Sequence, residues 1–136
     1  MIRVEPATVG HLTRVDLGSP VQEQLRALIL QLPRADVERV LLTKWARAAT
    51  HADGTVLCVA GVLDDGATWA LLSEHLAKRD CLAVFRIVRA GIAEFMAETG
   101  ITPYSEPERG VPEAPRVAHA LGFRYEGSDR WAWKPH

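Results

Sequence analysis

The sequence has few cysteines, no long apolar run and almost no net charge, and each shortage excludes a class of protein. Its two cysteines, Cys58 and Cys81, cannot build a disulfide framework, and both stand in apolar contexts typical of buried thiols. Charged residues interrupt every apolar stretch well before the roughly 18 residues of a membrane span. The start of the chain, Met1–Pro6, has no apolar signal core, so we expect a cytoplasmic protein without a membrane partner.

Charge and histidine spacing exclude two further classes. A formal net charge of -1 gives no strongly basic face, so we expect no nucleic-acid partner. The 5 histidines are scattered, and no His or Cys pair has ligand spacing, so we expect no metal. The 136 residues are 48% hydrophobic and 24% charged, which is enough for a single domain, residues 1–136, with a sizeable core. Nothing in the sequence indicates an oligomeric state.

Turn and capping residues divide the N-terminal half into a strand and two helices. Alternation over Ile2–Glu5 predicts a strand. Ser19-Pro20 predicts a helix start, because it combines a capping hydroxyl with proline at the first helical position. Asp36 is expected to cap a second helix that ends near Thr50. The apolar stripes of these helices are expected to be Val21, Leu25, Leu28 and Leu32 on the first, and Val37, Leu41, Lys44, Trp45 and Ala48 on the second.

Two apolar runs on either side of Asp64-Asp65-Gly66 predict a β-hairpin. Val56–Val62 and Thr68–Leu72 are apolar on successive residues, so we expect both strands at the centre of the sheet, covered on two faces. Asp80 is expected to cap the longest helix, and Gly100 to end it as a left-handed cap. The apolar positions of this helix repeat at steps of three and four: Leu82, Phe85, Val88, Ile92, Phe95 and Met96.

The C-terminal third predicts a short strand, a rigid loop, a short helix and a last hairpin. The strand covers Ile101–Tyr104, and Arg116–Leu121 forms one or two helical turns that Gly122 ends. Phe123–Glu126 and Trp131–Lys134 pair in the hairpin, with the two tryptophans on one strand face. We expect this face to pack in the core; the alternative is an exposed aromatic interaction surface. The loop contains Pro107, Gly110, Pro112 and Pro115. Strands and helices in this order predict an α/β fold with a mixed sheet.

Four pieces of the chain resemble, in this order, the GCN5-related N-acetyltransferase (GNAT) family. Ile2–Thr8 is similar to the first strand of that family, and Val59–Gly61 with the Asp65-Gly66 turn is similar to its second and third strands. Trp69–Leu72 and the long helix resemble the fourth strand and the cofactor-side helix, and Ala120–Phe123 resembles the closing motif. The resemblance implies an α/β, GNAT-like fold: a mixed, mostly antiparallel central sheet flanked by helices.

A narrower resemblance is to the short GNAT-like proteins of tailed phages and prophages. Those proteins carry Trp in the strand before the cofactor loop and Ser or Thr just after it. Trp69 and Ser73 hold these positions here. This resemblance implies a phage or prophage setting and does not define a reaction.

The GNAT resemblance also implies an acetyl-CoA site, with the pyrophosphate at the N-terminus of the long helix, where free N–H groups and the helix dipole favour anions. The family loop usually reads Arg or Gln, two residues, Gly, one residue, then Gly or Ala. The equivalent Ser73–Asp80 contains no glycine and adds acidic residues, so we expect weak binding or none. The candidate cofactor residues are Leu71, Leu72, Ser73, Lys78, Arg79 and Arg86. The last three are alternatively read as a solvated helix face.

Catalysis would need a base for the amine and an acid for the leaving thiolate. Backbone N–H groups near Leu71 and Leu72 would polarise the thioester carbonyl. We take Glu74 and His75 as the candidate catalytic residues, with Glu106 as a further candidate base. The tyrosine that the family usually supplies as the acid is replaced here by Ala118.

Two functions stay open on the sequence. The first is an acetyl-CoA-dependent N-acyltransferase, which the order of the motifs and the basic residues favour. The second is a non-catalytic GNAT-derived protein that binds a protein partner, for example in phage assembly or host interference. The loop without glycine, Ala118 and the 4 tryptophans favour the second. An unrelated α/β domain is the remaining alternative.

Overall fold

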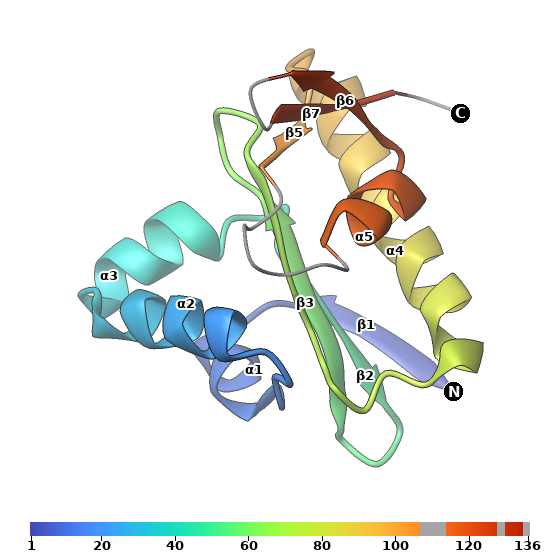
Figure 1. Cartoon of the computed structure of the whole chain (residues 1–136). Helices are drawn as coiled ribbons and strands as arrows, with labels where there is room; N and C mark the ends of the chain where they lie inside the picture. The colour runs from blue at the N-terminus through green and yellow to red at the C-terminus, as the bar shows by residue number, and fades with distance from the viewer. Residues whose placement is uncertain (107–113, 128–129, 135–136) are drawn as a thin grey trace.

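The computed structural model describes residues 1–106, 114–127 and 130–134. It contains a four-stranded sheet between two helical layers, and a separate three-stranded sheet lies at one end of the molecule (Figure 1). The elements are, in chain order, β1 (Ile2–Pro6), α1 (Val9–Arg14), α2 (Pro20–Gln31), α3 (Arg34–Asp36), the π-helical η1 (Val37–Leu41), β2 (Arg47–His51), β3 (Val56–Val62), β4 (Thr68–Leu72), α4 (Lys78–Thr99), β5 (Tyr104–Ser105), α5 (Ala114–Ala120), β6 (Phe123–Gly127) and β7 (Arg130–Trp133).

The first sheet has the order β1-β2-β3-β4, and all its pairs are antiparallel. β3 and β4 are joined through the Asp64-Asp65-Gly66 turn as predicted, and every residue of β3 is buried. The expectation that β4 is also central was wrong, because β4 is the edge strand of this sheet. The next strand along the chain, β5, pairs with β7 instead, and a parallel bridge between Ala67 and Tyr104 joins it to the start of β4.

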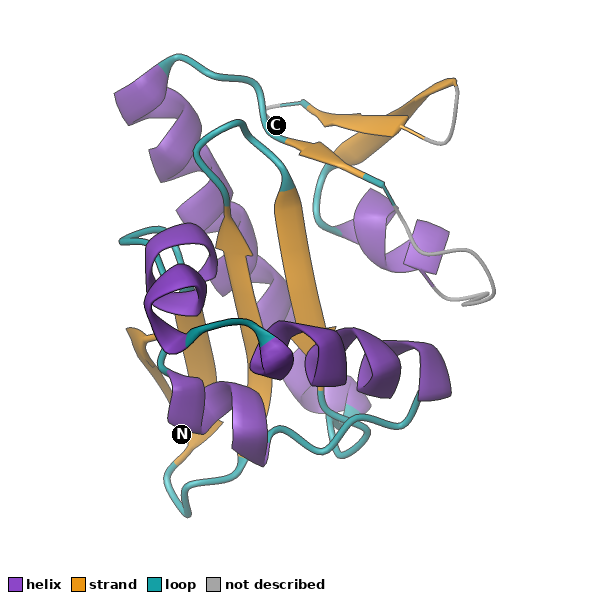
Figure 2. Cartoon of the chain, turned by 90° about the vertical axis from the view of Figure 1, so that its left-hand side faces the viewer, coloured by secondary structure: helices purple, strands orange, loops and turns teal. Residues whose placement is uncertain are grey.

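Helices cover both faces of the four-stranded sheet. Figure 2 shows α2 and its neighbours in front of the strands and α4 behind them. On the α1–α2 side, Leu12 and Val15 pack against Val59 and Leu71. On the α4 side, Val84 packs against Leu57, Cys58 and Ala60. The burial of Cys58 confirms the expected buried thiol, whereas Cys81 is only partly buried.

The second predicted helix is wrong beyond η1. Residues expected to be helical up to Thr50 instead form β2, which pairs with β1 on one side and β3 on the other. Asp36 makes no capping bond; its carboxylate accepts a hydrogen bond from Arg39. Ala48, Ala49 and Thr50 are all buried because strands flank them on both sides and helices cover the sheet. A fully buried strand carries no alternation, so the periodicity did not separate it from a helix.

The apolar stripe of α2 is only partly as predicted. Leu25 and Ile29 pack against the core, but Leu28 is 63% exposed and Leu32 is 47% exposed. The helix begins at Pro20 as expected, although Ser19 makes no side-chain capping bond. The packed pair Leu25 and Ile29 is four residues apart, so the buried face is rotated from the predicted stripe.

Helix α4 begins and ends near the predicted residues, but its start differs in detail. Ala77 is the N-cap, and Asp80 is the third helical residue, so the predicted Asp80 cap was wrong. Gly100 ends the helix with a φ of 72°, which confirms the left-handed cap. Leu82 is 62% exposed, and Val84 is fully buried in its place. On the 3.6-residue repeat, Val84 lies nearer than Leu82 to the centre of the buried stripe.

The second sheet has the order β5-β7-β6, with α5 beside it (Figure 1). Its β6–β7 hairpin confirms the last predicted hairpin, and the indole N–H of Trp133 donates to the Leu121 carbonyl at 2.9 Å. Trp133 is buried and Trp131 packs against the same cluster, as expected. Gly122 has a φ of 105°, which fits the predicted stop of α5. Pro107, Gly110 and Pro112 lie outside the described residues, and Pro115 lies in α5.

Candidate functional site

A cavity of about 450 Å³ lies where β4 and β5 separate. The starts of the two strands are held together by the Ala67–Tyr104 bridge and by a hydrogen bond from Tyr104 N–H to Gly66 O at 2.9 Å. Beyond that point, α5 and the start of α2 take the place of a neighbouring strand. The cavity is lined by Gly18, Ser19, Gln22, Leu25, Thr68, Trp69, Ala70, Leu72, Ser73, Glu74, Ser105, Glu106, Ala114, Val117, Ala118, Leu121 and Phe123.

The backbone of β4 presents its unpaired side to this cavity. Leu63 N–H donates to Ala67 O, and Ser73 N–H donates to Leu57 O, which fixes the alternation of the antiparallel ladder. Residues 69 and 71 therefore bond to β3, while the N–H groups of Ala70 and Leu72 face the open edge. Outside the ladder, no described backbone carbonyl accepts a hydrogen bond from either N–H. These two N–H groups are the donors that the cavity offers to a ligand carbonyl.

The wall opposite β4 is apolar. Val117 and Ala118 of α5 line the cavity, together with Leu121 just after the helix and Phe123 of β6. Ala118 is buried and brings no hydroxyl to the cavity, so it offers neither an acid nor a base there.

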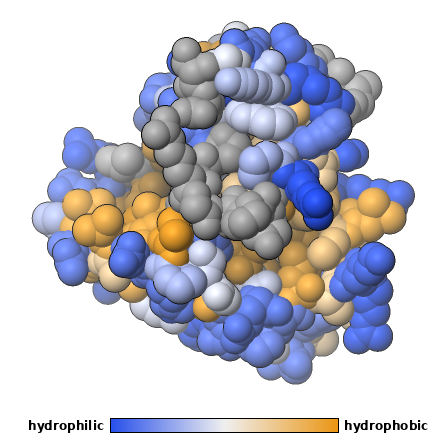
Figure 3. Space-filling view, in the orientation of Figure 1, coloured by the Kyte–Doolittle hydropathy of each residue, from blue (hydrophilic) through white to orange (hydrophobic). Residues whose placement is uncertain are grey.

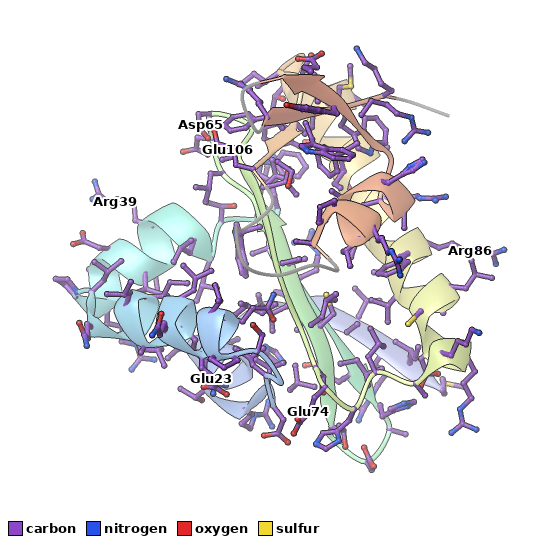
Figure 4. The ribbon with its side chains drawn as sticks, viewed as in Figure 1. Glu23, Arg39, Asp65, Glu74, Arg86 and Glu106 are labelled. Atoms are coloured by element: carbon purple, nitrogen blue, oxygen red, sulfur yellow. The ribbon has the colours of Figure 1, made fainter. Side chains whose placement is uncertain are left out.

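Two carboxylates line the cavity, at opposite ends. Figure 4 places Glu74 at the lower ends of the strands, beside the α1–α2 connection, and Glu106 at the end near the β3–β4 turn. The side chain of Glu74 is half exposed, and Glu106 is exposed. Each carboxylate is in contact with solvent, so either can act as a base for a ligand that enters from its own end.

The segment after β4 is tied to the α1–α2 connection. Ser73 Oγ accepts a hydrogen bond from His75 N–H at 3.0 Å, and Glu74 N–H donates to Asp16 O at 2.8 Å. His75 Nε2 lies 3.3 Å from Asp16 Oδ2 and 3.6 Å from Glu74 Oε1. A Cβ on Gly18 would lie 3.0 Å from the Glu74 Cβ, so glycine permits this close approach. Glu74 reaches the cavity wall, while His75 is not among the lining residues.

The start of α4 carries mixed charge. Lys78 and Arg79 are exposed, and the Asp80 carboxylate lies 3.1 Å from His51 Nε2 on β2. Arg86 is exposed and extends outward from α4 in Figure 4. Arg89 donates to the Ala120 carbonyl at the end of α5, with Nε at 2.8 Å, so it joins the two helices. None of these four cations lines the cavity.

The predicted site residues therefore divide into two sets. Leu72, Ser73 and Glu74 line the cavity, and so does Glu106. Leu71 is buried in the core on the α1–α2 side, and His75, Lys78, Arg79 and Arg86 lie outside the lining.

Ala70 was missed, although it stands two residues before Leu72 and alternation along a strand would have placed it on the same edge. The contribution of Ser19, just before α2, and of Gln22 in α2 had no signal in the sequence.

Trp69 lies on the other face of β4 and crosses over β3. Its indole Nε1 is buried without a hydrogen-bond partner among the described residues. The ring packs against Gly61, where an added Cβ would lie 3.0 Å from the Nε1 atom. Because Trp69 also lines the cavity, its position links the packing of β3 to the shape of the site.

Two shifted pKa values exclude two side chains as nucleophiles or bases at neutral pH. Burial raises the pKa of the Cys58 thiol to about 12. Burial, followed by its hydrogen bond to Asp65 at 3.1 Å, raises the pKa of Tyr104, and Arg130 over its ring at 3.9 Å opposes this. Both groups therefore stay protonated.

Within the described ranges, no three His, Cys, Asp or Glu residues converge as metal ligands. No helix of these residues combines the length and apolarity needed to cross a bilayer.

The comparisons with known proteins identify the fold. No protein-family model matches the sequence, and no curated protein matches it. Among solved structures, the chain is similar to Ard1 from Thermoplasma volcanium, an N-acetyltransferase of the GNAT family, with a TM-score of 0.62 and 16% sequence identity. The match covers 96% of this chain and 94% of that one. The fold is therefore α/β and GNAT-like, with a mixed, mostly antiparallel arrangement of strands flanked by helices.

Proposed function

We propose that this protein is an acyl-CoA-dependent N-acyltransferase-type domain. In this proposal the acyl thioester binds in the cavity beside β4, and the pyrophosphate is bound only weakly. The observation that carries the proposal is the open edge of β4, where the N–H groups of Ala70 and Leu72 face a cavity of about 450 Å³. Fixed backbone donors aimed at a carbonyl stabilise the charge that develops during acyl transfer.

The candidate base is Glu74, which lines the cavity two residues beyond Leu72. His75 Nε2 lies 3.6 Å from this carboxylate and in this proposal orients it without touching the substrate. Glu106 is the second candidate base, for an acceptor that enters from the opposite end. With Ala118 in place of an acid, the leaving thiolate takes its proton from water.

The weak pyrophosphate binding follows from the residues between β4 and the first turn of α4, Ser73–Asp80. The segment contains no glycine that would let several main-chain N–H groups converge on a pyrophosphate. The Glu74 N–H already donates to Asp16 O, and the Glu74 carboxylate adds negative charge. Lys78 and Arg79 offer charge at the helix start, but each exposed ion contact contributes about 1 kcal/mol or less. Arg86 extends outward, so it adds long-range attraction only.

A second candidate function is that of a non-catalytic GNAT-derived protein that binds a protein partner. The carboxylates of Asp16 and Glu74 near the start of α4 favour it, because they repel phosphates. Exposed apolar side chains also favour it: Leu28 and Leu30 on α2, and Leu32 just after it. Figure 3 shows an apolar area beside α2 and α3 on the face in view. Both candidate functions are compatible with a cytoplasmic location. Both are also compatible with a phage or prophage setting, which rests on Trp69 and Ser73 alone.

Calorimetric titration with acetyl-CoA and with S-acetyl-pantetheine, which lacks the nucleotide and pyrophosphate, tests the proposal. We expect both ligands to bind weakly, with dissociation constants within about tenfold of each other. A tenfold difference corresponds to about 1.4 kcal/mol, which is the scale that one or two exposed ion contacts can supply. Low micromolar binding of acetyl-CoA alone would contradict the weakened pyrophosphate contact. Absence of saturation by either ligand near about 1 mM would contradict the acyltransferase proposal and favour the protein-binding candidate.

A proline variant tests the backbone donor itself. Leu72→Pro removes an N–H that faces the cavity and leaves the hydrogen bonds to β3 in place. Leu72→Val keeps the N–H and is the matched control. We expect loss of acetyl-thioester binding in the proline variant only; equal binding by both variants would remove Leu72 N–H from the site.

A further inference from the structure

The outer edge of β1 is the longest stretch of unpaired strand backbone in the described part of the first sheet that does not face the cavity. β1 pairs only with β2, and Val4 is 48% exposed. Ala7 N–H donates to Ala46 O, which places Arg3 and Glu5 in the hydrogen-bonded pairs with β2. The backbone groups of Ile2, Val4 and Pro6 therefore point away from the sheet.

From this edge we infer that β1 pairs with β1 of a second copy of the chain, antiparallel and centred on Val4, so that two four-stranded sheets become continuous. In this register, the N–H of Val4 donates to the Val4 carbonyl of the other copy. The N–H of Ile2 donates to the Pro6 carbonyl of the other copy. Pro6 has no N–H, so it contributes only the acceptor that this register needs.

Charge selects this register. Arg3 and Glu5 share one strand face, and centring on Val4 places Arg3 of each copy opposite Glu5 of the other. A slip of two residues in either direction would set Arg3 against Arg3 or Glu5 against Glu5. Opposite charges facing each other across strands stabilise a pair, and like charges destabilise it. The edge is therefore self-complementary in one register only.

The side chains involved are accessible. Glu5 is 44% exposed; one of its oxygens accepts a hydrogen bond from Thr50 at 3.2 Å, and the other lies 3.6 Å from His11 Nε2. Arg3 makes a 3.4 Å hydrogen bond to Ala52 O at the surface. Charged residues and proline on an edge strand discourage pairing with unrelated strands. In a second copy, Arg3 and Glu5 meet opposite charges and Pro6 is used only as an acceptor. These two features therefore do not prevent pairing between two copies of the chain.

Complementary charge reversal tests the pairing. Arg3→Glu carries two acids on the edge and Glu5→Arg carries two bases, so each variant alone repels its own copies. Mixed together, they restore both opposite-charge pairs. By sedimentation velocity, the parent chain should associate to twice the mass of one chain as its concentration rises, and should dissociate at about 0.5 M salt. Each variant should stay monomeric, and the equimolar mixture should associate.

Val4→Pro and Val4→Thr make the test independent of Glu5, whose reversal also removes the contacts with Thr50 and His11. Val4→Pro deletes an N–H that β2 does not use, while Val4→Thr keeps it. We expect a monomer from the first and parental association from the second, with equal thermal unfolding at concentrations low enough that both are monomeric. A parent chain that remains monomeric near about 1 mM, or a dimer that Val4→Pro and Arg3→Glu leave intact, would overturn the inference.

Discussion

Gly61→Ala tests whether close packing of β3 holds Trp69 in position. An added Cβ would lie 3.0 Å from Trp69 Nε1 and 3.1 Å from both Trp69 Cε2 and Ala46 Cβ. Every residue of β3 is buried, so the crowding cannot be relieved at the surface. Inserting one methyl group into such packing typically costs about 1–3 kcal/mol, and we expect Gly61→Ala to lower the free energy of unfolding by that amount.

The matched control is Gly91→Ala in α4, where an added Cβ meets no atom within 4 Å. Alanine favours a helix over glycine by about 0.8–1.0 kcal/mol, so this variant should be more stable than the parent. Urea unfolding of the three proteins gives the comparison. If Gly61→Ala equals or exceeds the parent, or if both variants lose the same stability, the proposed contact between Gly61 and Trp69 is refuted.

Three further predictions concern α5 and the buried thiol. Gly122→Val should lower stability by more than about 1 kcal/mol, because Gly122 has a φ of 105°; an unchanged melting temperature would remove this cap. Arg89→Met should cost about 1–2 kcal/mol through loss of the hydrogen bonds to the Ala120 carbonyl, measured by urea unfolding, and Arg86→Met, at an exposed position, should cost less than about 0.5 kcal/mol. The pKa of Cys58 rises on folding from its ordinary 9.0 to about 12. Its contribution to stability is therefore complete below pH 9 and declines by up to about 1.4 kcal/mol per pH unit above it, a decline that Cys58→Ala should lessen.

The elements that could be predicted from the sequence are those with strong local signals. The Asp64-Asp65-Gly66 turn gives the β3–β4 hairpin, Pro20 gives the start of α2, and Gly100 gives the end of α4. Each of these residues acts on the backbone beside it, so no distant partner is needed for the prediction.

Strand β2 could not be predicted, because its identity depends on distant partners. Ala48 and Ala49 favour a helix in isolation and become a strand because β1 and β3 lie on either side. The edge position of β4 is likewise a property of topology, since it depends on β5 pairing with β7.

The candidate site was predictable where it depends on the order of elements and not where it depends on packing. Leu72, Ser73 and Glu74 follow from the end of β4, and they line the cavity. The outward position of Arg86 and the bond of Arg89 to α5 depend on the rotation of α4 about its axis, which spacing alone does not fix. The cavity itself arises from the separation of β4 and β5.

The backbone amides of β4 give the most direct test of the proposed acyl site. Amide chemical shifts of isotopically labelled protein, followed by NMR during titration with acetyl-CoA, report each N–H separately. We expect Ala70 and Leu72 to shift most, since their N–H groups face the cavity, and Trp69 and Leu71, which bond to β3, to shift less. Shifts confined to the exposed start of α4, or no shift in β4 at ligand saturation, would contradict the proposed acyl site.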